Sequence, residues 1–275
     1  MTRASASTKP ISTSSPLLRE TRGDIAVLAL DDPATRNALS EAMIAALHAE
    51  LNSIHDDKRI RAVVIAANGP AYSSGHDLKE LTARRADADK GRAFFAQMMQ
   101  SCSAMMQAIV HLPKPVIAAV QGVSTAAGCQ LVATCDLAVA SDKATFATPG
   151  IDIGLFCSTP MVALSRNVPR KHAMHMLLTG DLVSAERARE LGLVNTVVAA
   201  GKEREAAIEL AERIARKSAY TLKIGKEAFY RQAEMNLADA YAYTAQVMTE
   251  NMMARDAEVG IGAFIDKRDP EWEDR

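Results

Sequence analysis

The sequence predicts an α/β fold with a helical C-terminal region. Short apolar runs suited to buried strands recur in the first 140 residues, helix-like patterns separate them, and helix-like patterns dominate after Pro169. Strands joined by helices favour parallel pairing, because the chain must cross back over the sheet between them. We therefore expect a largely parallel sheet first and a group of helices afterwards.

Four apolar runs are expected to form the strands. Each is rich in Val, Ile, Leu or Ala and stops beside turn-forming or polar residues. Continuous apolar runs of this length are typical of strands that are covered on both faces. The runs are 24–30, 61–67, 116–120 and 137–140.

Helix-like patterns fill the intervals. Ser40 is a good N-cap for the amphipathic run 41–54, because its hydroxyl can accept a hydrogen bond from a free backbone N–H. A long pattern covers 93–111 and stops before Pro113. The Ala-rich segment 124–135 should turn into a helix. Further helices are expected at 171–178, 184–191, 202–218, 222–233, 236–252 and 255–267.

The change of pattern suggests three segments. Residues 1–16 are rich in Ser and Thr and lack the apolar stretch of a secretory signal, so a flexible tail is expected. Residues 17–200 would form the core and hold the ligand site. Residues 201–275 would form a C-terminal helical region.

Composition excludes several classes of function. A net charge of −1 and a pI near 6.6 give no electrostatic footprint for nucleic acid. No apolar stretch is long enough to span a membrane. The cysteines form no Cys-x-x-Cys pair and have no His at zinc-ligand spacing, so buried reduced thiols are expected and no metal site. They are Cys102, Cys129, Cys135 and Cys157.

Two loops are candidates for chemistry, because each follows a buried strand and enters a helix. They are 72–81 (YSSGHDLKEL) and 122–130 (GVSTAAGCQ). Backbone N–H groups at the start of a helix have no partner within it and can bind negative charge. Two such loops side by side could direct two N–H groups at one oxygen, as in an oxyanion hole. The alternative is that both are ordinary strand-to-helix turns.

A series of motifs resembles the crotonase (enoyl-CoA hydratase/isomerase) family over about residues 20–268. The motifs are RNAL (36–39), SGHDLKEL (74–81), QG (121–122), AGCQL (127–131), CD (135–136), FATPGIDIG (146–154), LTG (178–180), SA (184–185) and GLV (192–194). The runs SSGHDLKEL, TAAGCQL and ATPG…GLFCSTP are most similar to the subgroup called enoyl-CoA hydratase domain-containing proteins.

The resemblance implies a crotonase-type spiral of β-β-α units, with C-terminal helices that cover the site and build trimers or hexamers. Family members bind acyl-CoA thioesters and stabilise a thioester enolate. The oxyanion-hole donors would be the backbone N–H groups of His76 and Ala127. The His76 imidazole would be either a loop-packing group or a neighbour of the acyl pocket. Coenzyme A would arrive as part of the substrate, so no separate cofactor is expected.

The resemblance also indicates a set of coenzyme A contacts. Arg36, Lys79 and Lys267 make physical sense near phosphates, because Arg and Lys pair with them strongly. A solvated surface role is the alternative for each. The residues that the resemblance assigns to coenzyme A are Arg36, Ala38, Ser74, Asp77, Leu78, Phe264 and Lys267.

The family pattern breaks at the two acid/base positions. Hydratases of the family use two glutamates, and this sequence has Gln130 and Gly150 there. Hydration needs one group to take a proton from water and another to deliver a proton to carbon. An amide does neither and glycine has no side chain. Asp77, Asp136 and Asp152 lie near the motifs, and structural roles explain each of them better.

Two functional hypotheses follow. The first is an acyl-CoA enzyme of fatty acid metabolism that uses the oxyanion hole for isomerisation, thioester hydrolysis or a lyase-type step, and not for ordinary hydration. The second is a non-catalytic, regulatory acyl-CoA-binding relative. Either would form a homotrimer or a dimer of trimers, in the cytoplasm of a bacterium or the mitochondrial matrix of a eukaryote.

Overall fold

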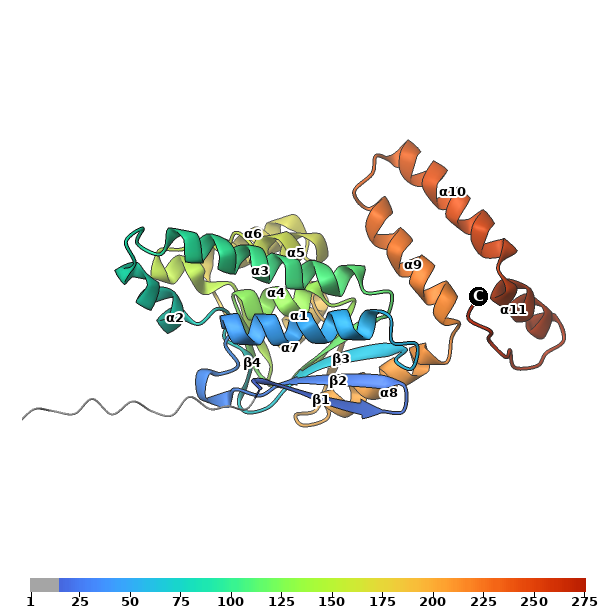
Figure 1. The fold of residues 1–275 in the computed structure, drawn as a ribbon, viewed down its shortest axis with the longest axis horizontal. Coiled ribbons are helices and arrows are strands. Elements are labelled where there is room, and N and C mark those ends of the chain that lie inside the picture. Colours follow the sequence, from blue (N-terminus) through green and yellow to red (C-terminus); the bar gives the residue numbers. More distant parts are fainter. Residues whose placement is uncertain (1–14) are drawn as a thin grey trace, which may run out of the picture.

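A six-stranded sheet, in the order β1-β2-β3-β5-β7-β10, organises the chain (Figure 1). The computed structural model describes residues 15–275. β1 pairs antiparallel with β2, and all other neighbours in this sheet are parallel. The predicted α/β class is therefore confirmed. The strands are β1 (Leu17–Arg22), β2 (Ile25–Leu30), β3 (Ala62–Ala67), β5 (Val116–Val120), β7 (Leu137–Ser141) and β10 (Thr196–Val198).

A second sheet of short strands, in the order β4-β6-β8-β9, stands beside the first. β4, β6 and β8 each follow a strand of the large sheet and precede a helix or helical turn, which gives the repeating β-β-α unit. The sequence does not predict these strands, because runs of two or three residues show no periodicity. They are β4 (Ala71–Ser73), β6 (Val123–Thr125), β8 (Thr145–Ala147) and β9 (Val183–Ser184).

The helices of the body follow the expected positions. Ser40 caps α1 as predicted, and its hydroxyl accepts a hydrogen bond from Met43 N. α5 was not predicted from the sequence. The elements are α1 (Glu41–His55), α2 (Leu78–Ala83), α3 (Arg92–His111), α4 (Ala127–Thr134), α5 (Pro160–Asn167), α6 (Arg170–Thr179) and α7 (Ala185–Glu190), with 3-10 turns η1 (Pro33–Thr35), η2 (Arg84–Ala86) and η3 (Pro149–Ile153).

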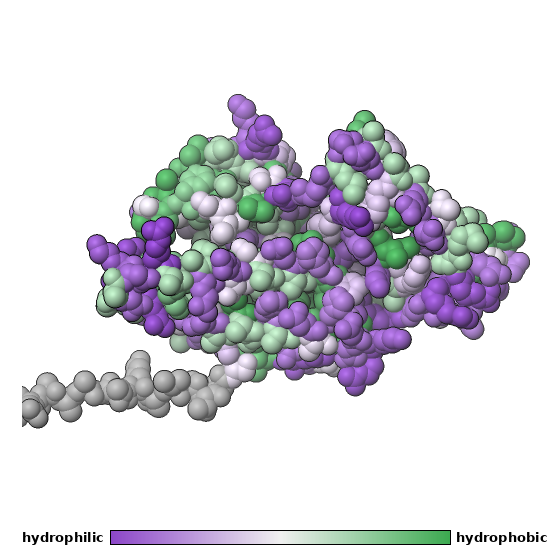
Figure 2. Space-filling model, turned by 45° about the horizontal axis from the view of Figure 1, so that its top comes forward, coloured by the Kyte–Doolittle hydropathy of each residue, from purple (hydrophilic) through white to green (hydrophobic). Residues whose placement is uncertain are grey.

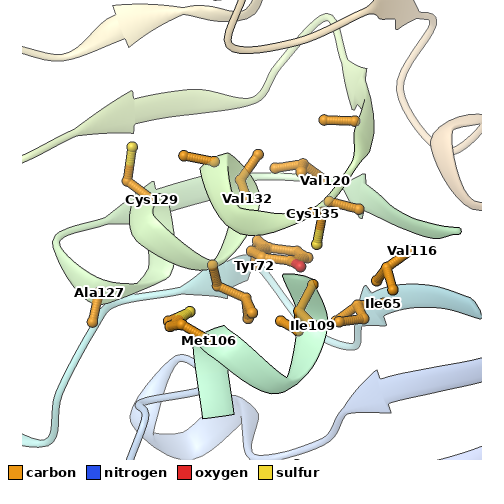
Figure 3. Close-up of a cluster of buried hydrophobic side chains, with 14 of the residues drawn as sticks. Ile65, Tyr72, Met106, Ile109, Val116, Val120, Ala127, Cys129, Val132 and Cys135 are labelled. Carbon is orange, nitrogen blue, oxygen red and sulfur yellow. The ribbon is translucent and has the colours of Figure 1, made fainter. Parts of the chain in front are cut away.

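Apolar clusters cover both faces of the large sheet. Alternate residues of β2 point to opposite sides: Ala26 and Leu28 join the larger cluster, and Ile25 and Val27 join the smaller one. In Figure 3, side chains of α3 and α4 lie on either side of Tyr72 in the larger cluster. All four cysteines are buried and free, as expected.

Helix α8 (Glu203–Ala215) belongs to this core. Its apolar residues pack against β2, β3, β5 and β7 in the smaller cluster, which contains Ala207, Ile208, Ala211 and Ala215. The helices that stand away from the sheet therefore begin after α8. Of the predicted tail 1–16, residues 1–14 lie outside the described part of the chain.

Three helices form an arm beside the body: α9 (Ala219–Gln232), α10 (Leu237–Met253) and α11 (Arg255–Ile265) (Figure 1). The end of the chain returns to the body. Arg61 Nη1 lies 2.6 Å from Asp274 Oδ2, and Ala219 N donates to Asp274 Oδ1 at 2.7 Å. Within residues 15–275 no helix has the length and apolar composition needed to cross a bilayer.

A largely buried ion pair fixes α9 to the body. Lys226 Nζ lies 2.7 Å from Asp136 Oδ2, and the two side chains are 8% and 16% exposed. Lys226 also donates to the carbonyl of Ile109 at the end of α3. Asp136 accepts from Tyr230 OH at 2.8 Å and from Val116 N at 2.7 Å. The expected structural role of Asp136 therefore includes a partner 90 residues away.

Replacing Lys226 by Met is expected to lower the free energy of unfolding by about 3–5 kcal/mol, because the Asp136 carboxylate then stays buried without a cation. Lys223→Met, one turn earlier on the exposed side of α9, is the matched control and should change stability by less than about 0.5 kcal/mol. Urea unfolding measures both. If Lys226→Met and Lys223→Met changed the free energy of unfolding equally, the ion pair would make no contribution to stability of its own.

Candidate active site

The two loops singled out in the sequence touch each other. β4 and β6 pair in parallel, so the segments that leave them run side by side. A Cβ on Gly75 would lie 3.0 Å from Ala126 Cβ and 3.1 Å from Ala127 N, and Gly75 has a φ of +86°. Thr125 Oγ1 also donates to Ser74 O at 3.2 Å. Glycine is required at position 75 by both the backbone conformation and the close approach.

The run of small residues brings the start of α4 against β4. A Cβ on Gly128 would overlap the carbonyl oxygen of Ser73 and lie 2.8 Å from Ser73 Cβ. Any larger residue at position 128 would push the helix away from the strand. The small side chains therefore permit a backbone-to-backbone approach, as the sequence suggested.

Two backbone N–H groups at this junction are unpaired. Ala126 turns the chain with φ 50° and ψ −118°, and its N–H donates to Ala147 O. The next residue, Ala127, begins α4. On the other loop, Leu39 N donates to Gly75 O at 2.8 Å. Among residues 15–275, the N–H groups of Ala127 and His76 donate to no acceptor. Unpaired N–H groups on touching loops can bind an oxygen that carries negative charge.

The His76 side chain is partly buried, and its Nε2 has no hydrogen-bond partner within the described residues. Burial lowers the pKa of the imidazole below its ordinary value of 6.5. The ring is therefore neutral at pH 7 and can accept a proton.

Gln130 lies one turn after Ala127 on α4 and is 5% exposed. Its Oε1 is buried without a hydrogen-bond partner in residues 15–275. A buried polar atom without a partner costs about 1–3 kcal/mol, so the amide is available to a ligand. It provides hydrogen bonds but no proton transfer.

The space beside Gly150 is already filled. A Cβ at this position would lie 2.9 Å from both Leu155 O and Cys157 Sγ. Burial raises the pKa of the Cys157 thiol, so the group next to the second acid/base position is a protonated thiol. The sequence analysis noted Cys157 but had no signal that it packs against Gly150.

The carboxylates singled out near the motifs are engaged or exposed. Asp77 caps α2, where its Oδ1 accepts from Lys79 N at 2.8 Å. Asp152 is exposed beside Gly180. The least exposed carboxylates of the described chain, Glu203 and Asp256, lie on α8 and α11, and the largely buried Asp136 is paired with Lys226. In residues 15–275 no group of three or more His, Cys, Asp or Glu side chains could hold a metal ion.

The structure brings most of the predicted coenzyme A contacts together. Ser74 N donates to Arg36 O at 3.1 Å, and Ser74 Oγ donates to Thr35 O at 3.2 Å, so the 36–38 and 74–78 segments are neighbours. Phe264, which is 86% exposed, and Lys267 lie at the end of the arm. In Figure 1, α11 and α2 lie at opposite ends of the molecule. Within one chain, Phe264 and Lys267 are therefore not close to the 36–38 and 74–78 segments.

Comparison with known proteins identifies the family. The family model described as "Enoyl-CoA hydratase/isomerase" matches residues 20–275. The chain belongs to this family. The crotonase fold and the resemblance to the domain-containing subgroup are therefore both confirmed.

Individual relatives agree with this assignment. The human "Enoyl-CoA hydratase domain-containing protein 3, mitochondrial" is 47% identical over 245 residues, which cover 89% of this chain and 79% of the relative. The crystal structure of human enoyl Coenzyme A hydratase domain-containing protein 3 has a TM-score of 0.89 at 46% identity, covering 94% of this chain and all of that chain. An enoyl-CoA hydratase from Mycobacterium smegmatis also has a TM-score of 0.89, at 47% identity over 94% and 99% of the two chains.

Gly150→Ala is expected to lower the free energy of unfolding by about 1–3 kcal/mol, because the added Cβ collides with Leu155 O and Cys157 Sγ. Gly225→Ala on α9 is the matched control, since a Cβ there meets nothing within 4 Å. The control should gain about 0.5–1 kcal/mol from its helical position. A neutral or stabilising Gly150→Ala would show that this loop yields readily and that a larger side chain fits.

Proposed function

We propose that this protein binds acyl-CoA thioesters and stabilises their enolate through the backbone N–H groups of His76 and Ala127. One observation carries the proposal: two unpaired N–H groups stand on loops that touch at Gly75 and Ala126. A thioester oxygen between them becomes negatively charged when the enolate forms. The two hydrogen bonds then strengthen, and this lowers the barrier.

Ordinary hydration is not the reaction we propose. Gln130 and Gly150 stand at the acid/base positions, and the space beside Gly150 holds a protonated thiol and not a carboxylate. Steps that need enolate stabilisation without an activated water, such as isomerisation or a lyase-type cleavage, fit the site better. A non-catalytic acyl-CoA-binding role is the second candidate, and the loss of both carboxylates favours it.

The arm supports a homo-oligomer, a trimer or a dimer of trimers. Apolar side chains lie on the surface of the body and the arm (Figure 2). In an oligomer, Phe264 and Lys267 could complete the coenzyme A site of a neighbouring copy. The most exposed large apolar residues of the arm are Phe229, Leu237, Tyr241, Met248, Met253, Phe264 and Ile265.

The compartment depends on the source of the chain. The human and rat relatives are named as mitochondrial proteins. We accordingly place the protein in the mitochondrial matrix if the chain is eukaryotic and in the cytoplasm if it is bacterial.

Thioester binding is tested by incubating the protein with crotonyl-CoA, trans-2-decenoyl-CoA and butyryl-CoA while thermal unfolding and product formation are followed together. All three should raise the Tm more than free coenzyme A does, because only a thioester oxygen reaches the two N–H groups. Hydration of crotonyl-CoA should be slow or absent. Stabilisation without turnover would select the non-catalytic role, and no stabilisation by any thioester would refute the proposal.

The oligomeric state is tested by light scattering after size-exclusion chromatography. The expected mass is three or six times the chain mass of 29.5 kDa. Phe264→Asp should shift the protein towards monomer, because a charge would enter the apolar contact between copies. Leu18→Asp, at an exposed position of β1, is the control and should leave the mass unchanged. A monomeric unsubstituted protein would refute this part of the proposal.

A further inference from the structure

Forming an enolate from a saturated acyl thioester, or from a 3-enoyl thioester in isomerisation, needs a base that removes the α-proton, and the groups at the two acid/base positions cannot do this. Gln130 carries a neutral amide and Gly150 has no side chain. The Cys157 thiol beside Gly150 has a raised pKa and stays protonated. Asp77 caps α2, and the largely buried Asp136 is paired with Lys226. The least exposed carboxylates of residues 15–275, Glu203 and Asp256, lie on α8 and α11. A different kind of residue must take the proton if the protein catalyses isomerisation or α-proton exchange.

His76 is the ionisable side chain at the junction of the two loops. Its backbone follows Gly75, which touches Ala126 and Ala127, and it pairs with Leu39 in an isolated bridge. These contacts hold the residue in place from both sides. His76 thus carries both an imidazole side chain and the backbone N–H that is proposed to bind the thioester oxygen.

The ring has no hydrogen-bond partner that would explain it as a packing group. Its Nε2 is buried and has no hydrogen-bond partner within residues 15–275. Buried polar groups without a partner are rare in native proteins, because each loses its bonds to water without replacement. The unpartnered nitrogen can therefore take a hydrogen bond or a proton from a ligand that reaches it.

We propose that His76 is the general base of this site and that its Nε2 removes the α-proton of the bound acyl thioester. This rests on the proposed thioester binding. The C–H bond at the α-carbon breaks, its electron pair moves into the enolate, and the proton bonds to Nε2. The enolate oxygen accepts hydrogen bonds from the N–H groups of His76 and Ala127. Return of a proton to the α-carbon gives exchange, and delivery of the proton to the γ-carbon of a 3-enoyl thioester gives isomerisation to the 2-enoyl thioester.

The electrostatic setting suits this role. Desolvation alone lowers the pKa of His76, and no charged side chain contributes to the shift. The ring is neutral at pH 7 and ready to accept a proton. Because burial disfavours the imidazolium, the ring returns the proton readily, so the base is regenerated without a second acidic group.

The experiment follows deuterium incorporation into butyryl-CoA in D2O by mass spectrometry, with thermal shift as the measure of binding. The unsubstituted protein should introduce deuterium at the α-carbon. His76→Gln keeps the backbone N–H and should bind butyryl-CoA within about threefold while exchange falls by about 100-fold or more. His76→Ala, a smaller replacement, should behave in the same way. His48→Gln on α1 is the matched control and should exchange normally.

Three results would overturn the assignment. Exchange that survives in folded His76→Gln and His76→Ala would mean that another group takes the proton. Binding of butyryl-CoA by the unsubstituted protein without any exchange would remove the base but leave the proposed binding intact. Absence of binding would remove the proposed function itself.

The pH dependence adds a further check. Exchange should fall as the pH drops through the pKa of His76, because a protonated ring cannot accept the α-proton. The midpoint should lie below 6.5, in the direction set by burial. A midpoint above 6.5 would contradict the assignment.

Discussion

The close approach of α4 to the loop after β4 is the constraint on which the site depends. Gly128 lets the start of the helix approach Ser73, and Gly75 lets the loop after β4 touch Ala126 and Ala127. With larger residues at these positions the two backbones would separate, and the N–H groups could no longer serve one oxygen. The small-residue run thus sets the distance between the two loops. The proposed chemistry depends on the backbone N–H groups of His76 and Ala127 and on the side chains beside them.

The proposed site has two unpaired backbone N–H groups, while Gln130 and Gly150 stand where the family resemblance implies glutamates. Gln130 offers an unpartnered amide, and Cys157 fills the space beside Gly150. A backbone donor tolerates many side chains, because the peptide supplies the hydrogen bond. The hydrogen bond from the His76 backbone does not depend on its side chain. The unpartnered Nε2 of that side chain is therefore available for the proposed proton transfer. The arm is joined to the body through the ion pair of Asp136 and Lys226.

Local signals in the sequence predicted the four central strands of the large sheet, most helices and the two loops, but not the edge strands β1 and β10. The Ser40 cap and the buried strands were readable because capping and hydrophobic pattern act within a few residues. The second sheet was not, since its strands are too short to show a period. Neither the contact of Cys157 with Gly150 nor the pairing of Asp136 with Lys226 has a local signal, because both depend on packing between distant segments.

A crystal structure with a bound, unreactive acyl-CoA analogue tests the central claim most directly. The account predicts that the thioester oxygen lies about 2.7–3.1 Å from the backbone nitrogens of both His76 and Ala127. A thioester oxygen held by only one of these nitrogens, or by neither, would contradict it.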